Sequence, residues 1–125
     1  MSQADCGVFP ARAEGWNLEL LEMMACGKHV IATDYSGDTQ CCNKENCLVI
    51  DIEDKEEAVD NKWFVGQGKW ASLGEKQLRQ TAYYMSAIHR AKSRGSLDPN
   101  INCTATAEKF SWQNTAREII NAIST

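Results

Sequence analysis

The sequence predicts an α/β protein built on a short parallel sheet, and three observations lead to this class. Two apolar stretches of strand length, Asp5–Pro10 and His29–Thr33, flank an apolar stretch of helical length, Gly15–Cys26. Gly27 stands where a left-handed residue commonly ends a helix. Both strands are almost wholly apolar, as in parallel strands that helices cover on both faces. We therefore expect a β-α-β unit.

The first helix has an apolar face that we expect to lie against the sheet. This face consists of residues that recur at helical spacing, namely Leu18, Leu21, Met24 and Ala25. After the second strand, a turn over residues 34–38 leads through a short helical turn near residues 39–43 to a third strand, Cys47–Ile50. The parallel sheet should therefore have about three strands.

The second half of the chain predicts helices rather than strands. Residues 51–70 show no clear period and are interpreted as a connecting loop, with Gly66-Gln67-Gly68 as a glycine-rich turn. A helix follows from Glu75 to about Arg94, with an apolar face made of Leu78, Ala82, Met85 and His89. Pro99 lies in a break before a last helix, whose apolar stripe must pack on something: Trp112, Ala116, Ile119, Ile120 and Ile123.

Length and charge limit the possible partners. A chain of 125 residues is predicted to form a single domain, and its net charge of −4 lacks the positive field that nucleic acids or anionic membranes attract. No apolar run approaches the roughly 20 residues that span a bilayer. Met1–Asp5 leads into a strand rather than a cationic signal region. We expect a cytoplasmic protein without a transmembrane segment or a nucleic-acid partner.

The six cysteines favour reduced, structural thiols. They include no C-x-x-C pair, and neither His29 nor His89 is spaced with a cysteine as zinc ligands normally are. Cys6 and Cys26 lie in apolar patterns, where a reduced cysteine behaves as a small hydrophobic residue. The cluster over residues 41–47 leaves a redox role open, since Cys41, Cys42 and Cys47 lie close in sequence. We expect no metal.

Two glutamates at the start of the first helix give the strongest functional signal. We expect the helix to begin near Gly15 or Trp16, so that its unpaired N–H groups face the end of a strand and suit a diphosphate. If the segment is helical throughout, Glu14 and Glu22 are separated by roughly 12 Å, about the distance from a sugar ring past a diphosphate to a ribose. The pair predicts a site for a nucleotide-linked sugar.

These motifs resemble one enzyme family over most of the chain. The run from Phe9 to Asp34, which holds Glu14-x7-Glu22 and the strand Val30-Ile31-Ala32-Thr33, is similar to the C-terminal, donor-binding domain of retaining GT-B glycosyltransferases, specifically group 1 of glycosyltransferase family 4. Ser36-Gly37 resembles the family's small-residue turn, Glu45–Ile50 its next strand, and Phe110–Ile120 its last helix. The resemblance implies a partial Rossmann-like, three-layer α/β/α fold with C-terminal helices.

The resemblance also implies roles for individual residues. Glu14 is the candidate catalytic residue and bonds the hydroxyls of the donor sugar, while Glu22 binds the ribose. The backbone from Gly15 through Trp16 and Asn17 to Leu18 approaches the diphosphate, although Asn17 stands where the family commonly has glycine. Departure of the nucleoside diphosphate needs no metal or other cofactor. Arg12, just before Glu14, is equally compatible with a phosphate contact and with a surface position.

The expected site forms only part of an enzyme of this family. A complete donor domain begins with three more strands, and an acceptor-binding N-terminal domain lies opposite it. We therefore expect a truncated donor domain that is inactive alone and that completes its sheet edge by self-association or with a partner that supplies the N-terminal domain. Two alternatives stay open: a non-catalytic binding module that keeps this fold, and a small redox or metal protein.

Overall fold

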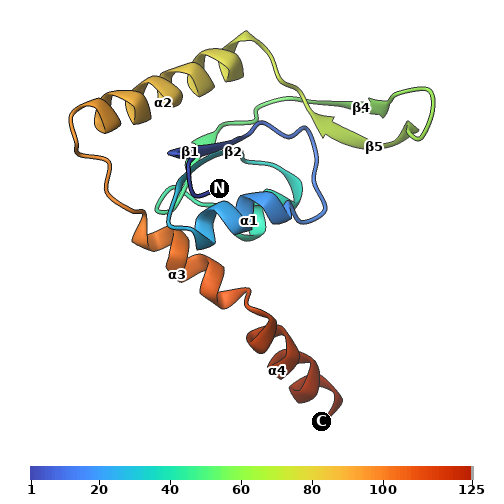
Figure 1. Cartoon of the computed structure of the whole chain (residues 1–125). Helices are drawn as coiled ribbons and strands as arrows, with labels where there is room; N and C mark the ends of the chain where they lie inside the picture. The colour runs from blue at the N-terminus through green and yellow to red at the C-terminus, as the bar shows by residue number, and fades with distance from the viewer. Residues whose placement is uncertain (125) are drawn as a thin grey trace.

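A three-stranded parallel sheet forms the centre of the protein, as the computed structural model of the chain shows for residues 1–124 (Figure 1). The strands are β1 (Cys6–Phe9), β2 (His29–Thr33) and β3 (Leu48–Ile50), in the order β1-β2-β3. Cys6 pairs with His29, and Ile31 pairs with Leu48. The predicted α/β class and the parallel sheet are confirmed.

Helix α1 (Leu18–Ala25) begins two or three residues later than the sequence predicted. Asn17 causes this shift, because its backbone is left-handed (φ 52°, ψ 68°) and its side chain accepts a hydrogen bond from the Leu20 N–H. Asparagine is among the preferred residues at this capping position. Gly27 adopts a φ of 66° just past the helix end, so the predicted left-handed termination is confirmed.

The core lies between α1 and the sheet. Leu20, Met23 and Met24 are buried on α1 and belong to one cluster with Val30 and Ala32 of β2. Residues three and four apart lie on one face of a helix, and here the set beginning at Leu20 is the inner one.

The predicted inner face of α1 is therefore largely wrong. Met24 is buried as expected, but Leu18 is 59% exposed and Ala25 is also exposed, while Leu21 is half-buried. These residues turn toward the C-terminal helices instead. Because α1 carries apolar residues on two sides, periodicity alone did not distinguish the side that meets the sheet.

The region interpreted as a connecting loop is an antiparallel hairpin, so that prediction is wrong. Strands β4 (Lys55–Val59) and β5 (Val65–Ala71) pair with each other and extend away from the sheet (Figure 1). Most of their side chains are exposed, so the sequence lacks the alternation of a half-buried strand. The glycine-rich segment Gly66-Gln67-Gly68 lies within β5 and is not a turn.

Asp60 forms the turn of the hairpin. Its side-chain oxygen accepts hydrogen bonds from the N–H groups of Lys62, Trp63 and Phe64 at 2.8 to 2.9 Å. Aspartate commonly stabilises a turn in this way. The same N–H groups, that of Phe64 foremost, lower the pKa of Asp60.

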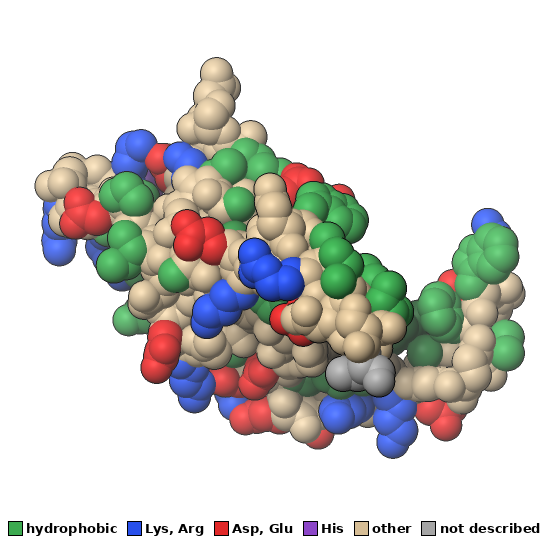
Figure 2. Space-filling view, turned by 90° about the horizontal axis from the view of Figure 1, so that it is seen from below, with side chains coloured by type: hydrophobic (Ala, Val, Ile, Leu, Met, Phe, Trp, Pro, Cys, Tyr) green, Lys and Arg blue, Asp and Glu red, His purple; other side chains and the backbone are tan. Residues whose placement is uncertain are grey.

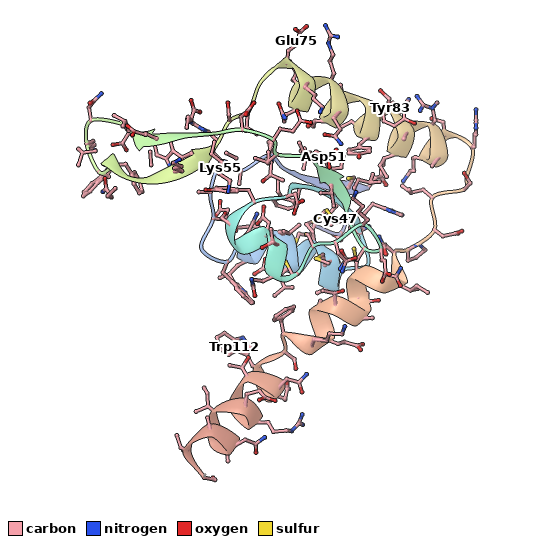
Figure 3. All side chains as sticks on the ribbon, turned by 180° about the vertical axis from the view of Figure 1, so that it is seen from behind. Cys47, Asp51, Lys55, Glu75, Tyr83 and Trp112 are labelled. Atoms are coloured by element: carbon pink, nitrogen blue, oxygen red, sulfur yellow. The ribbon has the colours of Figure 1, made fainter. Side chains whose placement is uncertain are left out.

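Helix α2 (Glu75–Ser93) was predicted correctly in extent but not in orientation. Leu78 and Met85, from the predicted apolar face, are 69% and 51% exposed. The residues of α2 that bond to the end of β3 are polar. Gln77 donates to the Asp51 carbonyl at 3.0 Å. Figure 3 shows Asp51 below α2, at the end of β3.

Polar side chains of α2 form hydrogen bonds with the backbone of the edge strand β3 and of the residue that follows it. Gln80 accepts a hydrogen bond from the Asp51 N–H at 3.0 Å and donates to the Val49 carbonyl at 3.2 Å. Tyr84 also donates to the Val49 carbonyl, at 3.1 Å. Edge strands leave backbone groups unpaired. The amide and hydroxyl side chains of α2 supply partners that an apolar face could not offer.

The C-terminal region forms two helices, α3 (Ile101–Lys109) and α4 (Trp112–Ile123), rather than the single helix expected. Helix α3 packs on α1 and buries Cys103, whereas α4 extends away from the body (Figure 1). Trp112 and Ile123 are 86% and 79% exposed, and Figure 2 shows a row of hydrophobic side chains on the face of the molecule seen from below. Within residues 1–124, the predicted stripe of α4 has no buried member, so the expected packing is not found.

Candidate functional site

The candidate site is formed by the two loops that follow β1 and β2. Residues 10–17 connect β1 to α1, and residues 34–35 connect β2 to the short 3-10 helix η1 (Ser36–Gln40). Because β1 and β2 are parallel, their carboxyl ends meet at one edge of the sheet. Ligands of open α/β sheets bind outside this edge. Helix η1 itself begins at Ser36, earlier than the helical turn that the sequence predicted near residues 39–43.

Backbone contacts hold the two loops together. The Glu14 N–H donates to the Ser36 hydroxyl at 2.7 Å, and the Gly37 N–H donates to the Glu14 carbonyl at 3.0 Å. A Cβ atom on Gly37 would lie 2.3 Å from the Gly15 carbonyl oxygen, closer than any side chain tolerates. The small-residue turn Ser36-Gly37 therefore fixes the backbone on which the Glu14 carboxylate is carried.

Asn17 makes a second connection, to a residue that the sequence analysis missed. Its side-chain N–H donates to an oxygen of the Asp38 carboxylate at 2.9 Å, while its own side-chain oxygen accepts from the Leu20 N–H at 3.3 Å. Asp38 is fully buried in η1. The only signal in the sequence was its place two residues after Ser36.

The environment of Asp38 disfavours its charged form. Burial raises the pKa of its carboxyl group, and the nearby negative charge of Glu14 acts in the same direction, whereas the side chains of Asn17 and Thr33 act against them. The second carboxylate oxygen of Asp38 is buried without a hydrogen-bond partner among the described residues. Such a group is uncommon in folded proteins and calls for an explanation.

Glu14 and Asn17 line a common hollow at the edge of the sheet. The hollow has a volume of about 400 Å³, and its lining comes from the end of β1 and the start of α1: Phe9, Pro10, Ala11, Glu14, Asn17 and Glu19. Glu14 and Glu19 are both exposed. Two exposed carboxylates around one hollow can accept hydrogen bonds from hydroxyl groups.

Glu22 lines a different cavity. A groove of about 610 Å³ runs between α1 and the C-terminal helices, and it is lined by Trp16, Leu18, Leu21, Glu22, Ala25, Ala107, Phe110, Trp112 and Thr115. Trp16 meets Phe110 edge to face, with ring centroids 5.1 Å apart. Residues 14–17 are not helical, so the helical rise does not set the distance between Glu14 and Glu22 as predicted.

Arg12 is bound to the hairpin. Its guanidinium forms an ion pair with Glu56 and lies 4.5 Å from the ring centre of Trp70. The backbone adds a further link, because the Ala71 N–H donates to the Arg12 carbonyl at 2.8 Å. Arg12, Trp70 and Glu14 line a common hollow of about 340 Å³. Arg12 thus lies beside the site, but its guanidinium is paired with Glu56.

The cysteines are free thiols, and several gather in the core. Cys41, Cys47 and Cys103 are buried, and burial raises the pKa of Cys6 and of Cys103 to about 11. Thiols with raised pKa values are poor nucleophiles and poor metal ligands, since both roles need the thiolate. Among residues 1–124, no three His, Cys, Asp or Glu side chains are arranged to hold a metal ion.

The sheet and its two joined loops define an α/β protein of partial Rossmann-like architecture, with a polar hollow at the carboxyl edge. Residues 1–62 match the model of a family described as "Glycosyl transferases group 1", so this segment is similar to a glycosyltransferase family domain. Searches of curated proteins and of solved structures find no match. In the part of the chain that the structure describes, no helix has the length and apolar character to cross a membrane.

Proposed function

We propose that this chain binds a nucleotide-diphosphate sugar as the donor part of a retaining GT-B glycosyltransferase. In this proposal residues 1–125 are the C-terminal portion of the donor domain, and the glycosyl group passes to an acceptor held by another domain. The single observation that carries the proposal is the position of Glu14. It lies in the segment that matches the glycosyltransferase family, and it lines the hollow outside the carboxyl ends of the strands.

Glu14 takes the sugar end of the ligand. Its carboxylate accepts hydrogen bonds from sugar hydroxyls, and its backbone is fixed on both sides by Ser36 and Gly37. A fixed acceptor loses little conformational entropy when ligand binds. We assign Glu14 as the catalytic residue on this basis.

The diphosphate lies at the start of α1. Backbone from Gly15 to Leu18 approaches it, and the positive end of the α1 dipole favours its charge. This stabilises the leaving nucleoside diphosphate without a metal. Arg12 adds a positive charge once it exchanges Glu56 for a phosphate oxygen.

The ribose lies on the other side of this loop, at Glu22. The segment from Glu14 to Glu22 separates the sheet-edge hollow from the groove of α1, with Trp16 in the lining of the groove. A ligand that crosses the segment presents its sugar to one cavity and its ribose to the other. The two carboxylates thus act on one ligand although they line different cavities.

Titration calorimetry of the 125-residue chain with UDP, GDP and ADP tests the proposal. We expect one of them to bind. Both Glu22→Ala and Glu14→Gln should lower the affinity for the corresponding nucleotide sugar. Because UDP, GDP and ADP lack the sugar, Glu14→Gln should leave their affinities unchanged. Glu118→Ala, an exposed glutamate on α4, is the matched control. Absence of binding by all three nucleotides would overturn the proposal.

The alternative is a non-catalytic interaction module that keeps this fold. The exposed apolar stripe of α4 favours it, since large exposed apolar patches commonly mark protein contacts. Both functions are compatible with self-association through the outer edge of β1 and with a partner that supplies an N-terminal domain. Nucleotide titration distinguishes them, because the interaction module binds none of the three nucleotides.

A further inference from the structure

We propose that Asp38 is a positioning residue that sets the conformation of the donor loop through Asn17. The proposal deepens the function above and depends on it for the ligand. Asp38 touches no ligand in this scheme. It acts by holding the Asn17 side chain, and with it the backbone from Gly15 to Leu18 that meets the diphosphate.

Asn17 needs such support because of its backbone conformation. Its φ of 52° lies in the left-handed region, which asparagine adopts when its side chain forms local hydrogen bonds. Both ends of its amide are engaged: the oxygen accepts from the Leu20 N–H, and the nitrogen donates to Asp38. One amide therefore caps α1 and joins the loop to η1. At this position a glycine would adopt the conformation without support.

Asp38 is itself held by backbone contacts. Its backbone carbonyl accepts hydrogen bonds from the N–H groups of Cys41 and Cys42 at 3.2 and 2.8 Å, and its side chain is fully buried. The carboxylate oxygen without a hydrogen bond is a cost that a neutral side chain of similar size would avoid. What the carboxylate provides in return is a strong acceptor for the Asn17 amide.

A double-mutant cycle tests the coupling. With the nucleoside diphosphate that binds the wild-type chain, we expect Asp38→Ala to weaken binding about tenfold, the equivalent of one lost hydrogen bond. In an Asn17→Gly background, the same Asp38→Ala change should have no further effect, because the glycine does not use the carboxylate. Equal losses of affinity in both backgrounds would overturn the proposal.

The conservative variant Asp38→Asn provides a second readout and guards against misfolding of Asp38→Ala. It retains an oxygen that accepts from Asn17, so affinity near neutral pH should stay within about twofold of wild type, a difference smaller than one hydrogen bond. A protonated Asp38 likewise keeps a carbonyl oxygen that accepts from Asn17, so the wild type and Asp38→Asn should show the same dependence of affinity on pH. Glu14 is the charged group that acts on Asp38, and Asp38 in turn raises the pKa values of Cys41 and Cys42.

Hydrogen exchange without ligand separates this proposal from the proposed function. Asp38→Ala should accelerate exchange of the Leu20 amide, whose acceptor is Asn17, but not of the Ala71 amide in the hairpin. If no nucleotide binds the wild type, the proposed function fails while this measurement still tests the positioning. Unchanged exchange at Leu20 would show that Asp38 does not hold the loop.

Discussion

The site of a Cβ atom on Gly37 lies 2.3 Å from the carbonyl oxygen of Gly15 and 2.8 Å from that of Glu14. Both neighbours are backbone atoms, so no side-chain rotation can relieve the contact. The loop after β1 and the turn after β2 thus touch where only glycine leaves room.

Gly37→Ala should move the Glu14 loop away from η1. We expect the unfolding free energy to fall by about 1–3 kcal/mol, the usual cost of overpacking. Urea unfolding measures it. Gly68→Ala is the control, because nothing lies within 4 Å of the corresponding Cβ position. A Gly37→Ala protein as stable as the Gly68→Ala protein would contradict the close contact.

Asp38 should make the protein less stable as pH rises. Its raised pKa means that the folded protein holds a proton which the unfolded chain has already lost. Stability from this group is therefore complete below the ordinary aspartate pKa and decreases until pH exceeds the raised value. Asp38→Asn should remove this decrease, as urea unfolding across the acidic range will show. An unchanged pH profile in the variant would assign the effect to another group.

Glu56→Gln should release Arg12 toward a diphosphate. We expect tighter binding of the nucleoside diphosphate, by a few-fold, because a competing carboxylate is removed. Stability should change by less than about 1 kcal/mol, since the ion pair is exposed. Glu53→Gln, which breaks the exposed pair with Lys76, is the matched control. If neither Glu56→Gln nor Arg12→Ala alters affinity, Arg12 serves only the hairpin.

Gln80→Leu should destabilise the attachment of α2. The substitution leaves the Asp51 N–H without its partner and removes one of the two side-chain hydrogen bonds to the Val49 carbonyl, at a cost of about 1–3 kcal/mol. Met85→Ala, on the exposed face of the same helix, should change stability by less than about 0.5 kcal/mol. Thermal unfolding of both variants tests the orientation of α2. The reverse order of effects would mean that the apolar face packs on the sheet.

Ile123→Ala should leave monomer stability almost unchanged, because its side chain is 79% exposed. Leu20→Ala, in the core, should cost about 2–5 kcal/mol. Chemical unfolding at several protein concentrations gives both values. A large effect of Ile123→Ala that grows with concentration would show that α4 packs on a second molecule.

The local pattern of apolar residues was sufficient to predict those elements whose structure depends on burial alone. The apolar runs around β1, β2 and β3 predicted a parallel sheet, and Gly27 marked the end of α1. The exposed strands β4 and β5 carry no such pattern, because pairing with each other, rather than burial, holds them. The prediction of which face of α2 turns inward failed for a related reason, because hydrogen bonding to β3 outweighed apolar contact.

The candidate site, too, was only partly predictable from the sequence. The sequence determined that Glu14 and Glu22 flank the start of a helix, and that Ser36-Gly37 forms a turn after the next strand. Only the tertiary structure decided that the turn holds the Glu14 loop, that Asn17 pairs with a buried Asp38, and that Glu22 faces another cavity. Spacing along a chain fixes neighbours within one element. Contacts between loops depend on how parallel strands bring their ends together.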